Sequence, residues 1–430
     1  MEDFGPLFRT ASRVSPKRGG SRLKLNTAGL FAGIGGLELG FHQAGHETAL
    51  LCEIEPHANA VLRGKFPDSD LHEDVRRLKG LPKIDLLAAG FPCQDLSQAG
   101  KTAGIKGKNS GLVGEVFRLL EAGRRGPKWL LLENVPFMLQ LDQGRAMTFL
   151  TKTLRELGYN WAYRTVDSRA FGLPQRRQRV ILLASKTEDP RTILYCDDAG
   201  PPNDLTPREQ KRVACGFYWT EGIRGLGWAV DAVPTLKGGS GIGIPSPPAI
   251  WMRHDDGEIV TPEIRDAERL QGFPADWTLQ REQDGISSGR KAVAARWKLV
   301  GNAVSVPLAK WVGDRLASPG EFEDFEKSRK FGGGAWPPAA CGIGKQVMRV
   351  DVSLWPLRVS APHLADFLQY PTKPLSERAT AGFLERTTRS QLRFSEGFVE
   401  AVTNHLERMR KSPEVAAPKT RRAKKRPAKA

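Results

Sequence analysis

The chain has 430 residues, of which 40% are hydrophobic, enough for one large α/β domain with a smaller partner or for two to three domains. No apolar run approaches the roughly 20 residues that span a membrane, no secretory signal is predicted, and the five cysteines form no C-x-x-C pair. These features argue against a membrane protein, a disulfide framework and a zinc site built by cysteine spacing. The net charge of +17 suggests a polyanionic partner, most often nucleic acid, and a surface that keeps the protein in solution explains it equally well.

Both ends of the chain are predicted to be flexible and basic. Residues 1–24 form a polar arm without periodicity, and residues 412–430 form a disordered tail. Seven Lys or Arg residues and no acidic residue lie between 419 and 429. The tail should therefore add salt-sensitive affinity for nucleic acid that does not depend on base sequence.

Short apolar runs alternate with helix-length stretches between residues 25 and 185. Apolar runs of this length are typical of strands that are buried on both faces of a parallel sheet. The alternation predicts a Rossmann-like, doubly wound and mainly parallel α/β sheet. The predicted strands are 25–31, 47–54, 84–90, 129–135 and 179–185, and the predicted helices are 36–43, 57–65, 112–122 and 147–157.

This rhythm ends near residue 186. Residues 186–260 are rich in Gly, Pro and Trp, and a smaller, irregular or β-rich domain is predicted at 187–290. Residues 291–318 return to a helical pattern with Pro307 near a helix start. Residues 319–345 have the composition of a linker. A C-terminal accessory segment follows at 346–411, and one face of an amphipathic helix is predicted in it from four apolar residues, Phe394, Phe398, Val402 and Leu406.

A glycine-rich turn, FAGIGG at 31–36, follows the first predicted strand. Its glycines let the backbone approach a ligand closely, and the next helix offers free N–H groups to an anion. Glu53, at the tip of the second strand, is placed to accept hydrogen bonds from a ribose diol, and Asp74 follows the third apolar segment. Together they predict an adenosine-type cofactor without separating NAD from S-adenosylmethionine; a tight turn without a ligand is the alternative.

Cys93 lies in a loop, GFPCQDLS at 90–97, that follows another predicted strand. Parallel sheets place their ligands at the carboxyl ends of strands, and a loop thiol becomes a nucleophilic thiolate when positive charge lies near it. Glu133 ends the next strand, so its carboxyl group can share a site with Cys93 and donate a proton to a ring nitrogen while the thiolate attacks the ring. Cys52 and Cys341 are predicted to be small core residues.

The segment QRRQR at 175–179 precedes a strongly apolar strand. Alternation along a strand puts Gln175, Arg177 and Arg179 on one side of it. Arginines on that side can hold Glu133, a phosphate or both. A solvated basic edge is the alternative, and it fits Arg176 better than Arg179.

In this order, the motifs resemble those of the C5-cytosine DNA methyltransferase family, of the bacterial modification-methylase type. The resemblance covers residues 25–316 and implies a catalytic, cofactor-binding domain at 25–186, a target-recognition domain at 187–290, and a return to the catalytic domain at 291–318. The matching stretches are FAGIGG (31–36), GFPCQDLS (90–97), ENV (133–135), QRRQR (175–179), ERLQGFP (268–274) and GNAVSVP (301–307).

The resemblance implies a reaction and assigns residues to it by motif position. S-adenosylmethionine would donate a methyl group to C5 of a cytosine flipped out of DNA. Cys93 would add to C6 of the base, and Glu133 would protonate N3. Arg179 would hold Glu133 and the base carbonyl, with Arg177 nearby or on the backbone. The cofactor would be bound by Phe31, Gly33, Ile34, Gly35, Gly36, Glu53, Ile54, Asp74, Phe91, Pro92, Asn302 and Ala303. DNA would be contacted by Gln94, Ser97, Thr235, Leu236, Lys237 and Gly238.

Two other functions stay open at this point. Relatives with the same catalytic motifs methylate cytosine in transfer RNA, and a relative can also bind DNA without catalysis, although intact Cys93, Glu133 and Arg179 argue against the second. We expect a monomer that acts on double-stranded DNA in the cytoplasm, at the nucleoid, without a metal or a membrane. A cognate restriction endonuclease acting on the same site is the protein partner that the resemblance allows.

Overall fold

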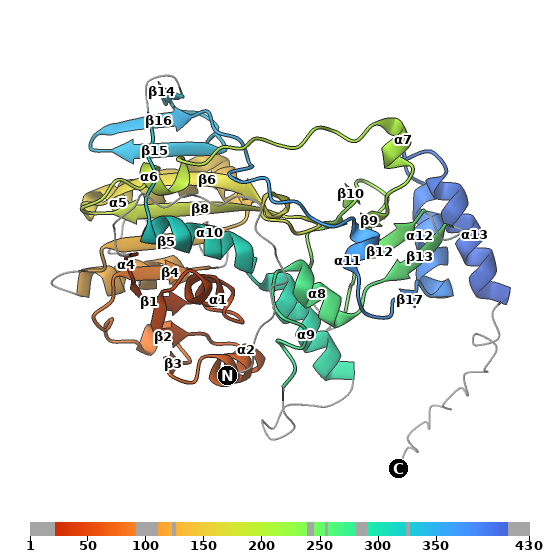
Figure 1. Cartoon of the computed structure of the whole chain (residues 1–430), viewed down its shortest axis with the longest axis horizontal. Helices are drawn as coiled ribbons and strands as arrows, with labels where there is room; N and C mark the ends of the chain where they lie inside the picture. The colour runs from red at the N-terminus through yellow and green to blue at the C-terminus, as the bar shows by residue number, and fades with distance from the viewer. Residues whose placement is uncertain are drawn as a thin grey trace, which may run out of the picture.

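The computed structural model describes residues 22–91, 111–122, 126–238, 245–253, 257–280, 290–323 and 327–411 (Figure 1). The first 21 residues of the predicted arm and the whole predicted tail lie outside these ranges. So do four predicted site residues, Pro92, Cys93, Gln94 and Ser97.

A ten-stranded sheet forms the larger part of the molecule, on the left of Figure 1. Its order is β14-β16-β15-β6-β8-β5-β4-β1-β2-β3. The block from β5 to β3 is parallel, and each strand from β8 outward is antiparallel to its neighbour. The strands are β1 (Asn26–Leu30), β2 (Glu47–Cys52), β3 (Asp70–His72), β4 (Leu86–Ala89), β5 (Trp129–Asn134), β6 (Asn160–Asp167), β8 (Gln178–Ser185), β14 (Ser328–Lys330), β15 (Ala339–Ile343) and β16 (Gln346–Val350).

The strand order of the sheet reverses at β1. The chain first adds β2 and β3 on one side of β1 and then adds β4 and β5 on the other. Every residue of β4 and β5 is buried, as expected for strands covered on both faces. Ligands of such sheets bind outside the carboxyl ends of the strands at this switch point, so the fold places the candidate site at the ends of β1, β4 and β5.

Helices cover both faces of the sheet (Figure 1). Leu131 of β5 faces Trp311 and the helices α1 and α10, whereas its neighbour Leu130 faces Phe117 and the helices α4 and α5. The predicted doubly wound α/β fold is thereby confirmed, with an antiparallel extension beyond β5. The helices are α1 (Gly36–Gln43), α2 (Pro56–Lys65), α4 (Gly111–Ala122), α5 (Arg145–Glu156), α6 (Arg191–Leu194), α7 (Pro207–Gln210), α8 (Ile264–Leu270), α9 (Arg290–Asn302), α10 (Val306–Ala317), α11 (Leu364–Phe367), α12 (Glu377–Thr388) and α13 (Phe398–Lys411).

A second, five-stranded sheet of order β10-β9-β12-β13-β17 forms the smaller part. This confirms the prediction of a smaller β-rich part. Its edge strand β17 comes from the C-terminal region and pairs with β13. A separate two-stranded pairing joins β7, which precedes β8 in the chain, to β11, which follows β10. The strands are β7 (Gln175–Arg176), β9 (Cys215–Phe217), β10 (Trp228–Val230), β11 (Val233–Pro234), β12 (Ala249–Met252), β13 (Glu258–Thr261) and β17 (Lys373–Pro374).

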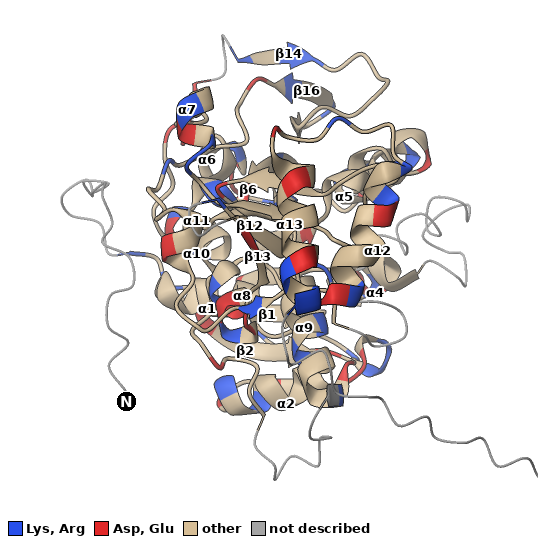
Figure 2. Cartoon of the chain, turned by 90° about the vertical axis from the view of Figure 1, so that its right-hand side faces the viewer, with Lys and Arg blue, Asp and Glu red and all other residues tan. Residues whose placement is uncertain are grey.

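The helices α12 and α13 complete the core of the smaller sheet. Figure 2 shows α13 in front of β12 and β13. Phe398 of α13 and Phe383 of α12 are fully buried against Phe217 and Trp251 of the sheet, with ring centroids 4.9 to 5.9 Å apart. The C-terminal region is therefore built into the same hydrophobic core as residues 215–261.

Two predictions for the C-terminal region need correction. The composition of 319–345 predicts a linker, yet this stretch contains β14 and β15, and β15 pairs with β6 in the large sheet. The strands escape the sequence pattern because they are short and flanked by Gly and Pro. The predicted apolar helix face is present in α13, but the helix begins at Phe398, so Phe394 precedes it.

Candidate active site

The glycine-rich turn lies at the carboxyl end of β1. Phe31 and Gly33 have φ values of 56° and 59°, and a Cβ at Gly33 would meet no atom within 4 Å. At Gly36, by contrast, a Cβ would lie 2.4 Å from the carbonyl oxygen of Val304. The turn is therefore open beside Gly33, and it is closed at Gly36 by the segment that leads into α10.

Ile34 and Gly35 face the protein interior. Ile34 is buried with Phe273 and Trp277, and its carbonyl oxygen accepts a hydrogen bond from the Trp277 indole N–H at 2.9 Å. A Cβ at Gly35 would lie 2.3 Å from the ring of Phe66. These two residues hold the turn in place, so any contact that Ile34 makes with a cofactor would involve its backbone.

Glu53 follows β2, and three backbone N–H groups fix its carboxylate. One oxygen accepts a hydrogen bond from Gly33 at 2.8 Å, and the other accepts from Ile54 and Glu55 at 2.9 Å each. The apolar side chain of Ile54 is 63% exposed. A carboxylate has about four acceptor positions, so Glu53 can still accept from a ribose hydroxyl, while Ile54 offers an apolar surface to a base.

Asp74 lies farther along the same edge, but its carboxylate already has a partner. It caps the 3₁₀ turn Val75–Arg77 and accepts hydrogen bonds from the Arg76 backbone N–H, Nε and Nη2 at 2.9 to 3.0 Å. The hydrogen bonds from Arg76 lower the pKa of Asp74. Burial, together with the charges of Glu53 and Asp74, raises the pKa of the Cys52 thiol to about 12, so Cys52 is not a nucleophile at neutral pH.

Glu133 and Arg179 form a buried ion pair at the carboxyl end of β5. The Nε of Arg179 lies 2.9 Å from Oε1 of Glu133. Only 8% of the Arg179 side chain and 10% of the Glu133 side chain are exposed. Burial lowers the pKa of Arg179, and the carboxylate of Glu133 opposes that shift. The contact that the resemblance implies between these two residues is present.

The end of β4 is fastened next to this ion pair. The Asn134 side-chain amide donates a hydrogen bond to the Phe91 carbonyl oxygen at 3.0 Å. A Cβ at Gly90 would lie 3.5 Å from Oε2 of Glu133, in van der Waals contact, so Gly90 adjoins the carboxylate. Phe91 is the last described residue before Cys93, and the chain therefore leads into the predicted nucleophile loop beside Glu133.

Alternation at 175–179 is confirmed, because Gln175, Arg177 and Arg179 are buried and Arg176 is exposed. Arg177, however, has hydrogen-bond partners that the sequence does not reveal. Its Nη groups donate to the carbonyl oxygens of Leu236, Gly301 and Ala303 at 3.3, 3.2 and 2.6 Å.

Burial, and then the charge of Arg179, lower the pKa of Arg177 well below its usual value. Arg177 thus joins segments that are far apart in sequence, and its hydrogen bonds go to these carbonyl groups and not to Glu133. Its geometry is that of a positioning residue.

Buried amides extend this network. Gln175 accepts a hydrogen bond from the Leu236 backbone N–H at 3.0 Å and donates to the Leu270 carbonyl oxygen at 2.8 Å. Gln271 accepts one from the Ser305 hydroxyl at 2.9 Å. Gln271 and Ser305 lie within the ERLQGFP and GNAVSVP motifs, and the sequence alone assigns them no role.

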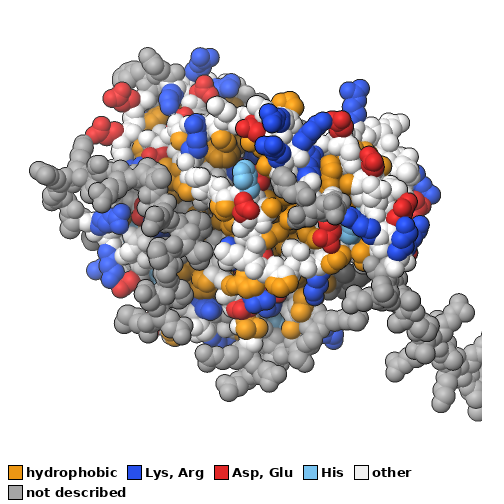
Figure 3. All heavy atoms as spheres, turned by 45° about the vertical axis from the view of Figure 1, so that its right-hand side comes forward, with side chains coloured by type: hydrophobic (Ala, Val, Ile, Leu, Met, Phe, Trp, Pro, Cys, Tyr) orange, Lys and Arg blue, Asp and Glu red, His pale blue; other side chains and the backbone are white. Residues whose placement is uncertain are grey.

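The predicted DNA-contacting segment Thr235–Gly238 lies against the end of α9. A Cβ at Gly301 would come within 2.3 Å of the Lys237 backbone, and one at Gly238 would come within 2.9 Å of the side-chain oxygen of Asn302, which is exposed. Leu236 is buried and Lys237 is exposed, so only the latter presents its side chain to solvent. On the face drawn in Figure 3, basic side chains lie among acidic and hydrophobic ones, and charge alone does not outline a DNA-binding surface.

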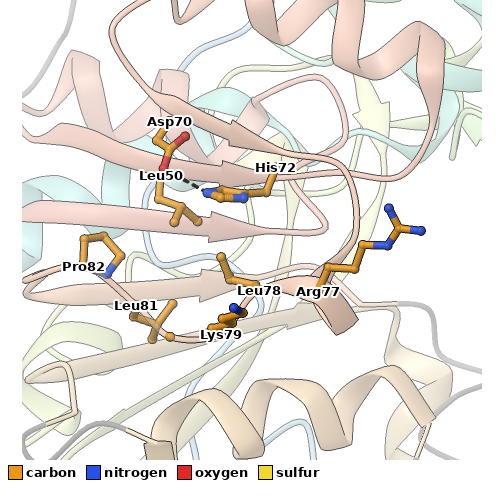
Figure 4. Close-up of a pocket in the computed structure, with 9 residues that line it drawn as sticks. Leu50, Asp70, His72, Arg77, Leu78, Lys79, Leu81 and Pro82 are labelled. Atoms are coloured by element: carbon orange, nitrogen blue, oxygen red, sulfur yellow. Dashed lines mark hydrogen bonds and ion pairs between the residues drawn. The ribbon is translucent and has the colours of Figure 1, made fainter.

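A shallow pocket beside the edge strand β3 is separate from these residues (Figure 4). Asp70 and His72 form an ion pair in its wall at 2.9 Å, and Arg77 and Lys79 also line it. None of the residues predicted for catalysis, cofactor or DNA lines this pocket. In the described ranges, no group of three or more His, Cys, Asp or Glu side chains is arranged to hold a metal. None of the helices described has the length and apolarity needed to cross a bilayer.

Comparison with known proteins places this geometry in a family. The family model for C-5 cytosine-specific DNA methylase matches residues 25–214. The Type II methyltransferase M2.BsuMI of Bacillus subtilis (strain 168) is 50% identical over 392 residues, which cover 89% of this chain and 98% of that protein. The Type II methyltransferase M1.ScrFI of Lactococcus lactis subsp. cremoris is 29% identical over 351 residues, 74% of this chain and 83% of that protein. The chain therefore belongs to the C-5 cytosine-specific DNA methylase family and is a DNA (cytosine-5)-methyltransferase.

Proposed function

We propose that the enzyme transfers a methyl group from S-adenosylmethionine to C5 of a cytosine flipped out of double-stranded DNA, through a covalent bond between Cys93 and C6. The observation that carries the proposal is the buried pair of Glu133 and Arg179 next to Gly90, where the chain enters the Cys93 loop. A carboxyl group fixed by an arginine at this point can act on a ring nitrogen of a base whose carbon is within reach of the loop.

The residues at the ends of β1 and β2 fit S-adenosylmethionine. The turn is open beside Gly33, the Glu53 carboxylate is fixed with acceptor capacity to spare, and Ile54 is an exposed apolar side chain. Phe31, Gly33 and Glu53 would hold the methionine and ribose parts, and Ile54 would cover the adenine. We place Asp74 at the adenine end with its backbone, because Arg76 occupies its carboxylate. When bound, this donor supplies an electrophilic methyl group on a sulfonium.

The protein residues would act on the base in sequence. The Cys93 thiolate would add to C6 and Glu133 would give a proton to N3, so electron density gathers at C5. There the new bond to the methyl carbon forms while the methyl–sulfur bond breaks and leaves its electron pair on the sulfur. A base, such as a water molecule, then removes the C5 proton, the electron pair of that bond expels the Cys93 thiolate, and the N3 proton returns to the Glu133 carboxylate. Arg179 holds Glu133 throughout. Removing the cytosine from the duplex costs a few kcal/mol of unstacking, which contacts in the pocket offset.

Arg177 would support this site without touching the base. Its hydrogen bonds tie the Thr235–Gly238 segment to the end of α9, so the predicted DNA-contacting residues are held at a fixed position relative to Glu133. We further propose a restriction endonuclease with the same target as a functional partner, in keeping with the Type II names of the relatives. The enzyme would then act in the same compartment as the chromosome.

Fluorine at C5 of the target cytosine provides a direct test of the covalent step, because fluorine cannot leave as a positive ion and the adduct with Cys93 cannot eliminate. Incubation with S-adenosylmethionine and 5-fluorocytosine DNA should give a protein–DNA species that survives denaturation. Cys93→Ser should give none while still binding the cofactor. Glu133→Gln should form the adduct at least about a hundredfold more slowly. A stable adduct in Cys93→Ser would refute the assignment of the nucleophile.

A further inference from the structure

A loop of the smaller part, residues 219–226, connects β9 to β10 and is here called the recognition loop. Its tip is open to solvent, because Ile223 is 50% exposed and Arg224 and Gly225 are also exposed. An exposed aliphatic side chain beside an exposed guanidinium suits contact with DNA, where arginine reads guanine or binds phosphate and apolar groups contact the thymine methyl. The loop thus has the chemistry of a DNA-contacting element.

The recognition loop is joined to the predicted DNA-contacting segment. Glu221 forms an ion pair with Lys237, and its other carboxylate oxygen accepts a hydrogen bond from the Gly227 backbone N–H at 2.6 Å. The Tyr218 hydroxyl donates to the Thr235 carbonyl oxygen and accepts from the Lys237 backbone N–H, both at 2.9 Å. Lys237 also lies over the Tyr218 ring at 4.0 Å. The loop and the Thr235–Gly238 segment therefore form one connected unit.

The helix α12 holds the other side of the recognition loop. Arg386 donates hydrogen bonds to the carbonyl oxygens of Trp219 and Glu221 at 2.5 and 3.0 Å. The hydroxyl of Ser390, just beyond the helix, donates to the Ile223 carbonyl oxygen at 3.1 Å. These contacts span 165 residues or more of sequence, so a C-terminal helix sets the backbone of a loop in the centre of the chain.

The loop needs such support because of its composition. Gly222 has a φ of 114°, and a Cβ there would lie 3.1 Å from the ring of Phe383 in α12. Gly222 and Gly225 leave the loop with more conformational freedom than other residues would. Fixing a loop in its bound shape before binding lowers the entropic cost of binding. The hydrogen bonds from Arg386 and Ser390 to the carbonyl oxygens of Trp219, Glu221 and Ile223 fix the loop in this way.

We propose that α12, through Arg386, positions the recognition loop to read the bases around the target cytosine, so that the C-terminal segment contributes to sequence specificity. The inference rests on the proposed function, since it requires methylation of DNA at defined sites. Arg386 itself does not touch DNA. It is a positioning residue, because its forked guanidinium group donates hydrogen bonds to two carbonyl groups at once. Lysine, a compact charge without that fork, cannot reproduce the arrangement.

The test compares Arg386→Ala and Arg386→Lys with a matched control, Arg389→Ala. Arg389 lies at the end of the same helix, carries the same charge, is 72% exposed and pairs with Glu385 instead of the loop. The sites methylated by the wild type are first mapped at base resolution. For each variant, kcat/KM is then measured on that site and on sites with one base pair changed, together with KM for S-adenosylmethionine.

In both Arg386 variants, the ratio of kcat/KM on the mapped site to kcat/KM on its single-base variants should fall about tenfold or more. One mismatched base pair typically changes binding by a factor of this size. KM for S-adenosylmethionine should not change, and Arg389→Ala should behave as the wild type. If Arg386→Ala does not fold, Ser390→Ala and Arg224→Ala replace it, and each should reduce discrimination with the fold intact.

Three results would overturn the inference. The first is unchanged discrimination in the folded variants, whether or not the melting temperature falls. The second is an equal loss of discrimination in Arg389→Ala. The third is discrimination that Arg386→Lys fully retains. A wild type that methylates no DNA would instead refute the proposed function, so the two failures can be told apart.

Discussion

Glu38 is a buried acid that lies directly behind the glycine-rich turn. Glu38 belongs to α1 and is fully buried, and neither of its carboxylate oxygens has a hydrogen-bond partner in the described structure. Desolvation by burial raises the pKa of Glu38 to about 7, and the nearby charge of Glu53 adds to the shift. The folded protein therefore retains this proton at pH values where the unfolded chain has released it.

The stability of the protein should fall as the pH rises through this range. In the unfolded chain Glu38 has the ordinary glutamate pKa of 4.5. The loss of stability therefore begins near pH 4.5 and is complete above pH 7. It amounts to roughly 3 kcal/mol of unfolding free energy. Because Glu38→Gln cannot ionise, its free energy of unfolding relative to the wild type should increase by that amount between about pH 4.5 and 8. Urea denaturation across the range measures it. Glu121→Gln, at an exposed position, should show a constant difference, and a constant difference for Glu38→Gln would contradict the account.

At the same scale, the sequence predicts which residues of 175–179 are buried but not all that they bind. Strand alternation suffices to place Gln175, Arg177 and Arg179 on one side. The partners of Arg177 are carbonyl groups at 236, 301 and 303, and any residue has a carbonyl group, so no residue type marks them. The residues alone allow Glu133, a phosphate or both as partners of these arginines, and it is the family resemblance that assigns Glu133 to Arg179, as the structure has it.

At the scale of elements, the apolar strands of the large sheet are predictable because both faces are covered. The predicted helix 36–43 agrees with α1 at both ends, and the predicted strand at 129–135 agrees with β5 within a residue. The short edge strands β3, β14 and β17 have two or three residues each. They carry no apolar period, and their pairing is set by distant segments, so the sequence pattern does not reveal them.

The C-terminal helix α13 supplies a core residue to the smaller sheet, and this can be tested by substitution. Phe398 is fully buried, and its ring centroid lies 4.9 to 5.9 Å from those of Phe217, Trp228, Trp251 and Phe383. Phe398→Ala should lower the free energy of unfolding by about 3–5 kcal/mol.

The matched control for this substitution is Val399→Ala, because Val399 is the next residue and is 36% exposed. It should change the free energy of unfolding by less than about 1 kcal/mol. Guanidinium denaturation followed by tryptophan fluorescence reports on both variants, since Trp228 and Trp251 lie in the cluster. Equal effects of the two substitutions would show that α13 does not share the core.

At the scale of the whole molecule, the C-terminal region connects the two sheets. Residues 339–350 extend the large sheet through β15 and β16, and residues 373–411 complete the smaller one. The resemblance ends near residue 316, so it could not anticipate this arrangement. The composition did indicate correctly that residues 346–411 can pack, because they contain apolar residues at helical spacing.

The basic tail should govern salt dependence without affecting site choice. Removal of residues 412–430 deletes seven Lys or Arg residues between 419 and 429. The slope of log K for DNA binding against log salt should then become shallower, by about 0.9 for each phosphate that the tail no longer neutralises. The set of methylated sites should stay the same. Binding isotherms at several salt concentrations measure the slope, and an unchanged slope would mean that the tail does not contact DNA.

The proposed reaction depends on attack by Cys93 on a cytosine in DNA, which allows methylation at C5. Its most direct test is transfer of labelled methyl groups from S-adenosylmethionine to unmethylated duplex DNA, with total transfer RNA in parallel and Cys93→Ser alongside the wild type. We expect label on cytosine C5 in DNA at one short repeated sequence, none in transfer RNA, and at least a roughly thousandfold loss in Cys93→Ser. Label in transfer RNA alone, or turnover by Cys93→Ser close to that of the wild type, would contradict it.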